Sequence, residues 1–101
     1  MLYGVTHNGS IGPSDLHTVD PATGATTFVG PILGFVGCSG MDINSAGAMY
    51  AVCERDSDFA SVLVEIDPAT GAGFEVGPTG LTYPVTDISF RFSDDRLFAF
   101  D

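Results

Sequence analysis

The sequence predicts an all-β fold made of repeated antiparallel strands. The word DPATGA occurs twice, at residues 20–25 and 67–72. Short segments rich in Val, Ile, Phe and Tyr alternate with clusters of Gly, Pro, Asp and Ser, which is the pattern of strands separated by turns. The 13 Gly and six Pro favour many turns. No window shows an apolar period of about 3.6 residues between helix caps.

The repetition extends well beyond that word, at an offset of 47 residues. The matching segments are LYGV (2–5), MYAV (49–52) and LFAF (97–100); LHTVDPATGATTFVGP (16–31) and LVEIDPATGAGFEVGP (63–78); and GMDI (40–43) and VTDI (85–88). A period of this size indicates a repeat architecture. We therefore expect a single segment over residues 1–101, with repeats at 2–47 and 48–94 and the start of a third at 95–101.

Each repeat contains four segments with the composition of strands. They are 2–6, 16–20, 26–30 and 40–44 in the first repeat, and 48–53, 62–67, 73–77 and 87–92 in the second. Four antiparallel strands in a repeat of about 40 to 50 residues describe one blade of a β-propeller. With strands lettered a to d from the innermost outwards, we expect the order b-c-d, a-b-c-d and a-b, which is an incomplete ring.

Each residue type in the repeated word suits a tight reversal between strands c and d. An aspartate accepts backbone N–H groups two or three residues on, a proline presets φ at the first central position, and a glycine takes the left-handed position. These roles fall on Asp20, Pro21 and Gly24 in the first copy and on Asp67, Pro68 and Gly71 in the second. The word is therefore predicted to be a structural turn rather than a binding site.

The LY strand, the DPATGA…VG segment and the DI strand together resemble repeats of secreted and surface bacterial β-propellers of the YVTN and quinoprotein-like kind. The resemblance covers nearly the whole chain and implies the fold. The quinoprotein repeat also carries a tryptophan that docks neighbouring blades. Phe28 and Glu75 stand at that position, and the chain contains no Trp. We therefore expect no quinone cofactor.

The net charge of the chain argues against nucleic acids and anionic membranes as partners. Thirteen acids against three basic residues, with no Lys, give a formal net charge of −10. Such a surface repels nucleic-acid phosphates and anionic membranes. No apolar run approaches the roughly 18 residues of a membrane helix, and Met1 starts no signal peptide. The chain is then either cytoplasmic or the mature or internal part of something longer, and the acidic, Lys-free composition favours an extracellular or cell-surface location.

Catalysis is not expected. His7 and His17 are the only histidines, and Ser10 and Ser14 lie near them in the sequence. There is no Gly-x-Ser-x-Gly motif, and no nucleophile and base are recognisable as a pair. The remaining alternatives for an enzyme are a hydrolase of unknown kind and a remnant of a quinoprotein-like activity.

An acidic loop is a candidate calcium site. Glu54, Asp56 and Asp58 alternate along the segment ERDSD, and alternating carboxylates can present several oxygens to Ca²⁺. The EF-hand pattern requires a glycine next, and Phe59 stands there instead. A solvated acidic loop is the alternative.

The two cysteines, Cys38 and Cys53, are placed just before strand a and at the end of strand b of the second blade. A hairpin turning around residues 45–47 brings those ends side by side, so a disulfide is one expectation. A pair of buried thiols is the other. An extracellular location would preserve the bond.

We expect a non-catalytic interaction or structural module. Two blades and a fraction do not close a ring, since propellers need about four to eight. The ring is expected to be completed by the remaining blades of a longer chain or by self-association, and a contact that fails to close would give a filament. The alternative is a lectin-like glycan binder, whose candidate aromatic platforms are Tyr3, Tyr50, Phe59 and Tyr83.

Overall fold

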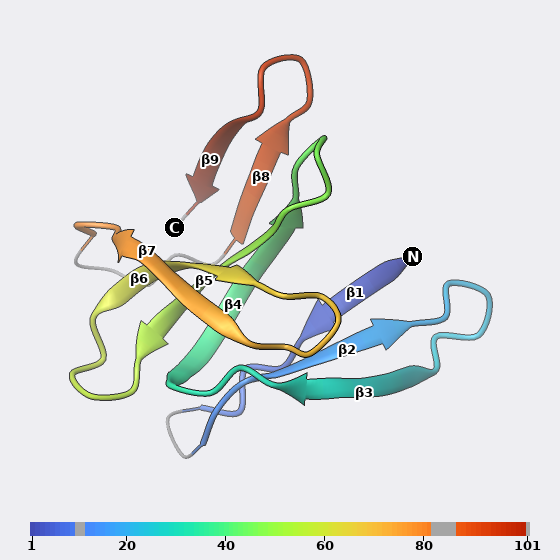
Figure 1. Cartoon of the computed structure of the whole chain (residues 1–101), viewed down its shortest axis with the longest axis horizontal. Helices are drawn as coiled ribbons and strands as arrows, with labels where there is room; N and C mark the ends of the chain where they lie inside the picture. Colours follow the sequence, from blue (N-terminus) through green and yellow to red (C-terminus); the bar gives the residue numbers. More distant parts are fainter. Residues whose placement is uncertain (10–11, 82–86, 101) are drawn as a thin grey trace.

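The computed structural model describes residues 1–9, 12–81 and 87–100, and contains nine strands and no helix among them (Figure 1). The strands form three antiparallel sheets. Sheet 1 contains β1 (Leu2–Val5), β2 (Asp15–Val19) and β3 (Thr26–Pro31). Sheet 2 contains β4 (Phe35–Ile43), β5 (Met49–Arg55), β6 (Ser61–Ile66) and β7 (Gly73–Pro78). Sheet 3 contains β8 (Asp87–Arg91) and β9 (Arg96–Phe100).

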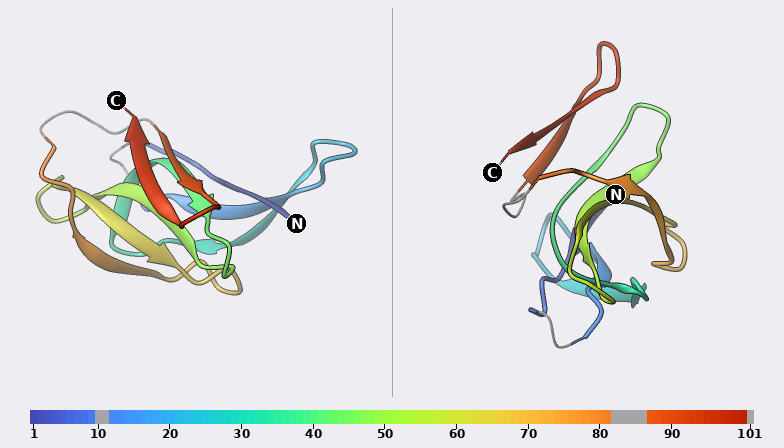
Figure 2. Two further views of the ribbon diagram at one scale, coloured as in Figure 1. Left: turned by 90° about the horizontal axis from the view of Figure 1, so that it is seen from above. Right: turned by 90° about the vertical axis from the view of Figure 1, so that its left-hand side faces the viewer.

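The three sheets follow one another in space as they do in the chain. Sheet 2 lies in the middle, with sheet 1 on one side and the β8–β9 hairpin on the other (Figures 1 and 2). Strands within each sheet are neighbours in sequence order, joined by hairpins. This grouping of three, four and two strands is the grouping that the repeat pattern predicted.

The alternation of side chains along β5 explains how one sheet can pack on both of its faces. Met49, Ala51 and Cys53 belong to the core shared with sheet 1. Tyr50 and Val52 belong to a second, smaller cluster that includes Ile88 of sheet 3. Because successive residues of a strand point to opposite faces, an unbroken apolar strand is the pattern of a sheet buried on both sides.

Both copies of DPATGA form the same turn. Asp20 Oδ1 accepts the Ala22 N–H at 2.8 Å, and the Asp20 carbonyl accepts the Gly24 N–H at 2.7 Å. The equivalent bonds of Asp67 measure 2.9 and 2.8 Å, to Ala69 and Gly71. The glycines have φ of 78° and 86°, the left-handed conformation that glycine adopts without strain.

Strand β4 is longer than the sequence indicated. It begins at Phe35 rather than at residue 40, and Cys38 lies inside it rather than before it. Gly37, with φ of 58°, sits in an irregular stretch where pairing with β5 is interrupted between Val36 and Gly40. The sequence did not predict a strand here, because the Gly and Ser residues of this stretch form a bulge that interrupts the regular alternation of inward and outward side chains.

The third sheet also differs from the sequence alignment, by two residues. The alignment of GMDI with VTDI equates Ile88 with Ile43. In the structure Ile88 lies opposite Ala99, as Met41 lies opposite Ala51. Ile88 precedes Leu97 by nine positions, whereas Ile43 precedes Met49 by six, so β8 continues further before its turn. Ile88 therefore takes the position of Met41, and a shift of two residues keeps the same face of the strand inwards.

Glycines set the distance between successive sheets. A Cβ atom at Gly40 would lie 2.6 Å from Asp87 Cα, so β4 and β8 approach backbone to backbone. On the other side of sheet 2, a Cβ atom at Gly71 would lie 2.7 Å from the carbonyl oxygen of Gly30. Such approaches leave no room for a side chain.

We expect Gly71→Val to destabilise the fold more than Gly24→Val. Each places a β-branched residue at positive φ, which costs about 1–2 kcal/mol, but only Gly71 also packs on another sheet. Urea unfolding of the two variants measures the difference. Asp20→Asn and Asp67→Asn serve as controls and should be mild, since Asn also forms such turns. Equal losses for the two glycines would contradict the packing role of Gly71.

Candidate functional site

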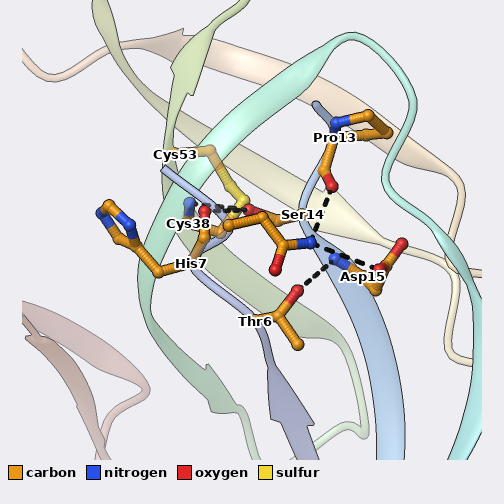
Figure 3. Close-up of a disulfide and its surroundings, with 8 residues drawn as sticks. Thr6, His7, Pro13, Ser14, Asp15, Cys38 and Cys53 are labelled. Carbon is orange, nitrogen blue, oxygen red and sulfur yellow. Dashed lines mark hydrogen bonds between the residues drawn. A yellow bond between two sulfur atoms is a disulfide. The ribbon is translucent and has the colours of Figure 1, made fainter. Parts of the chain in front are cut away.

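A hollow of about 390 Å³ lies where the loop after β1 meets the turn after β5, lined by His7, Gly9, Glu54 and Phe59. His7 and Gly9 lie in the loop between β1 and β2 of sheet 1, while Glu54 lies in β5 of sheet 2 and Phe59 in the turn that follows β5. Figure 3 shows the His7 imidazole beside the disulfide, with its ring directed away from it. The hollow thus combines a carboxylate, an imidazole and an aromatic ring from two sheets.

Gly37 makes room for the two polar groups of the hollow. A Cβ atom there would lie 2.5 Å from Glu54 Oε1 and 3.6 Å from His7 Nε2. The Gly9 N–H donates to His7 Nδ1 at 3.2 Å, so a neutral imidazole carries its hydrogen on Nε2. The hollow therefore offers an acceptor, the Glu54 carboxylate, next to a donor, the His7 Nε2–H.

Phe59 adopts a backbone conformation that is unusual for its residue type. Its φ is 58°, and its side chain is 53% exposed. The Phe59 N–H bonds to the Arg55 carbonyl at 2.7 Å, which is the bond that Gly71 makes to Asp67 in its own turn. A phenylalanine therefore occupies a position where glycine would be unstrained. Strain of this kind is concentrated at functional sites in proteins.

Cys38 and Cys53 form a disulfide that joins β4 to β5 beside the hollow (Figure 3). Both residues are buried in the core between sheets 1 and 2. The bond closes a separation of 15 residues within sheet 2. Among the described residues there is no free cysteine.

Ser14 is a structural residue that the sequence did not reveal. It is fully buried, and its Oγ accepts the Cys38 N–H at 3.0 Å while donating to the His7 carbonyl at 3.4 Å (Figure 3). Its own N–H bonds to the Phe35 carbonyl at 3.1 Å. Ser14 therefore ties sheet 1 to β4. Its hydroxyl contacts the His7 backbone rather than the imidazole, so the two do not form a nucleophile and base.

The other residues considered for catalysis are His17 and Ser10. His17 lies in β2 with its ring edge-on to Phe28, at a centroid distance of 5.6 Å. Within the described residues, His17 Nδ1 is buried and has no hydrogen-bond partner. Ser10, like the sugar-platform candidate Tyr83, lies outside the described residues. Tyr3 and Tyr50, the other sugar-platform candidates in strands, pack against the two cores.

The calcium candidates Glu54, Asp56 and Asp58 are not brought together. In the part of the chain that the structure describes, no group of three or more His, Cys, Asp or Glu residues could hold a metal ion. Asp58 is instead bound by Arg55, at 2.7 Å, while Glu54 faces the hollow. The turn thus directs its carboxylates to different partners rather than converging them on one point.

Arg55 forms a clamp with two carboxylates. Its Nε and Nη2 bond to Glu75 at 2.9 Å each, and its Nη1 bonds to Asp58. The hydrogen bonds from Arg55 hold the pKa of the Glu75 carboxyl below its usual range. The pKa of Asp58 is lowered first by the Ala60 N–H and then by Arg55. Glu75 and Phe28 occupy equivalent ladder positions, opposite Val64 and His17, so the clamp stands where the resemblance placed a tryptophan.

The sequence matches no protein-family model, no curated protein and no solved structure. Among the described residues, none belongs to a helix long and apolar enough to cross a membrane. The functional conclusion therefore depends on the geometry of the chain itself.

We expect reduction of the Cys38–Cys53 bond to lower the free energy of unfolding by about 3 kcal/mol, the loop-closure estimate for a 15-residue separation. Thiol titration of unreduced, denatured protein should find no free thiol. Denaturant unfolding with and without reductant measures the stability change, and a Cys38→Ala, Cys53→Ala double variant insensitive to reductant is the control. Two titratable thiols in protein kept under air would contradict the disulfide.

Proposed function

We propose that the chain is a non-catalytic, extracellular interaction or structural module built from β-propeller blades. The observation that carries this proposal is the repeated stacking of sheets. Sheet 2 packs on sheet 1 through one face and on sheet 3 through the other, and the residues at the two interfaces follow the repeat. Stacked four-stranded antiparallel sheets with short hairpins are the construction of propeller blades.

The two outer faces support an association with further sheets of the same kind. Leu2 and Gly4 of sheet 1 correspond to Met49 and Ala51, which are buried against a neighbouring sheet. Leu2 is exposed. At the other end, Phe98 of sheet 3 corresponds to Tyr50 and is also exposed. Apolar faces of this kind are normally covered by a partner. The partner is a second copy of the chain or further blades of a longer one.

The buried disulfide and the acidic, Lys-free composition support the extracellular location, because disulfides persist in oxidising compartments. The placement of Ser14 and the two histidines supports a non-catalytic role, since none of them forms an acid–base pair with another.

We expect the chain to self-associate, with a melting temperature that rises with protein concentration. Association covers the apolar outer faces and stabilises the native state by mass action. Multi-angle light scattering and calorimetry over a dilution series measure both. A monodisperse monomer whose melting temperature is independent of concentration would contradict self-association.

A glycan-binding role is the second candidate, favoured by the exposed, strained Phe59 next to Glu54 and His7. An aromatic ring beside an acceptor and a donor offers both stacking and hydrogen bonds to a small polar ligand. Glycine would adopt this backbone conformation without strain, so the turn itself does not require a phenylalanine.

Phe59→Gly tests this second candidate, because the substitution should raise the stability of the fold and lower its affinity for glycans. Relief of the left-handed strain should stabilise the fold by about 1 kcal/mol, while loss of the ring should abolish glycan binding. A glycan array and urea unfolding measure the two effects. Phe92→Ala, at an exposed aromatic in the β8–β9 turn, is the matched control. Unchanged binding in both Phe59→Gly and Glu54→Gln would rule out the hollow as a glycan site.

A further inference from the structure

The second DPATGA turn does more than reverse the chain, because it docks on the preceding sheet. Gly71 of this turn and Gly30 of β3 are both buried. A Cβ atom at Gly71 would lie 2.7 Å from the Gly30 carbonyl oxygen, and a Cβ atom at Gly30 would overlap the Thr70 carbonyl oxygen. The turn and the strand therefore touch backbone to backbone, which is an approach that only glycine permits.

The contact consists of a turn glycine, Gly71, and a strand glycine, Gly30, and the sequence repeat contains a second copy of each. Gly24 corresponds to Gly71, and Gly77 corresponds to Gly30 in the word VGP. The turn at Gly24 has the same hydrogen bonds and the same sign of φ as the turn at Gly71. No described atom lies within 4 Å of a Cβ atom placed on Gly24 or on Gly77. Within the described part of the chain, Gly24 and Gly77 therefore each lack the partner that Gly71 and Gly30 have in one another.

The surroundings of Gly77 are apolar and uncovered. Gly77 borders a hollow of about 250 Å³ between sheets 2 and 3, whose lining includes Val52, Leu63, Val76, Ile88 and Leu97. Val76 is 59% exposed, whereas its repeat equivalent Val29 packs against the core between sheets 1 and 2. The environment that receives the turn at Gly30 is thus repeated at Gly77, where residues 1–9, 12–81 and 87–100 supply no equivalent turn.

We propose that the turn formed by residues 20–24 of one copy of the chain docks on Gly77 of a second copy and repeats the internal contact between Gly71 and Gly30. This inference rests on the proposed function and names the surface through which the module associates. The β2–β3 turn and the end of β7 lie on opposite sides of the molecule (Figure 1). The contact is therefore heterologous, and each copy can bind one neighbour at each end.

Docking with the internal geometry exchanges one strand. The turn at 20–24 connects β2 to β3, and β2 pairs with β1 through Leu2 opposite Val19. In the docked arrangement β2 of the incoming copy lies beside β9, which is an edge strand of sheet 3 and repeats the sequence of β1. Strand β9 therefore replaces β1 as the partner of β2, with Leu97 opposite Val19. The exchange substitutes one antiparallel pairing for an equivalent one. Its cost is the packing of Tyr3 and Val5 of β1 against the core between sheets 1 and 2.

Charge opposes this association and makes it depend on salt. Each copy carries a formal net charge of −10, so two copies repel one another at low ionic strength. Salt shortens the range of that repulsion to a few ångströms near 1 M, while apolar burial at the docking surface persists. Association through Gly77 is therefore stronger at high salt.

Two substitutions block one half of the contact each and preserve the fold. Gly77→Val adds a side chain at an open strand position without positive φ. Gly24→Asn keeps the turn, because Asn tolerates the left-handed conformation, but adds a side chain where the turn would touch Gly77. Gly30→Val and Gly71→Asn make the same changes at the occupied contact and should destabilise the fold. Gly12→Val, at an open position elsewhere, is the surface control.

Sedimentation velocity at about 0.5 M salt reads out the association, where repulsion between copies is screened. The wild-type chain and Gly12→Val should associate, and Gly77→Val and Gly24→Asn should each bind at least about tenfold more weakly, which is roughly 1.4 kcal/mol. An equimolar mixture of these two variants should form a one-to-one dimer, because one retains the turn and the other retains Gly77. Urea unfolding confirms that each variant is folded.

Each other outcome has a distinct meaning. Association of Gly77→Val and Gly24→Asn as strong as that of wild type would overturn the docking contact and leave self-association standing. Failure of the mixture to dimerise, with both single variants monomeric and folded, would also overturn it. A wild-type chain that stays monomeric at every concentration and salt would overturn self-association itself.

Discussion

The backbone contact between Gly30 and the Thr70–Gly71 turn is the constraint on which the rest of the structure depends. It brings sheet 2 close enough to sheet 1 for a shared core to form, with Ser14 bonded across the boundary. The approach of Gly40 to Asp87 does the same for sheet 3. Burial of apolar side chains supplies most of the stabilisation in such a core, but the hydrophobic effect is non-directional and does not fix how the sheets are placed. The glycines determine how near the sheets come and in which register they meet.

The sequence determines the strands and turns well because these features are local. The types and spacing of Asp, Pro and Gly in DPATGA specify a turn without reference to any other part of the chain. The start of β4 was predicted wrongly, and the alignment of GMDI with VTDI is displaced by two residues, for the opposite reason. A strand interrupted by Gly37 is recognisable only through its pairing with β5, and the register of β8 is set by its own hairpin and by the face that meets sheet 2.

The hollow formed by His7, Glu54 and Phe59 could not be assembled from the sequence, because its members come from two sheets. The sequence nevertheless contained a signal for one feature of the hollow, the left-handed backbone conformation of Phe59. The segment RDSDFA at 55–60 has the layout of DPATGA, with Phe59 at the glycine position. Comparison of the two turns would have identified a left-handed phenylalanine. The Arg55 clamp had no such signal, since Glu75 lies two strands away and was considered only as the substitute for a tryptophan.

The arrangement of turn and strand glycine within one repeat has a consequence for how such a chain can change in length. Each 47-residue unit holds one DPATGA turn and, a few residues later, one VGP glycine. An in-frame tandem duplication of a unit therefore adds one DPATGA turn, which can dock on the VGP glycine of the preceding unit. It also adds one VGP glycine, on which the turn of a following unit can dock. New sheets can be added by copying genetic material alone, with no compensating substitutions at the junction. The internal symmetry of the sequence is the record that such copying would leave.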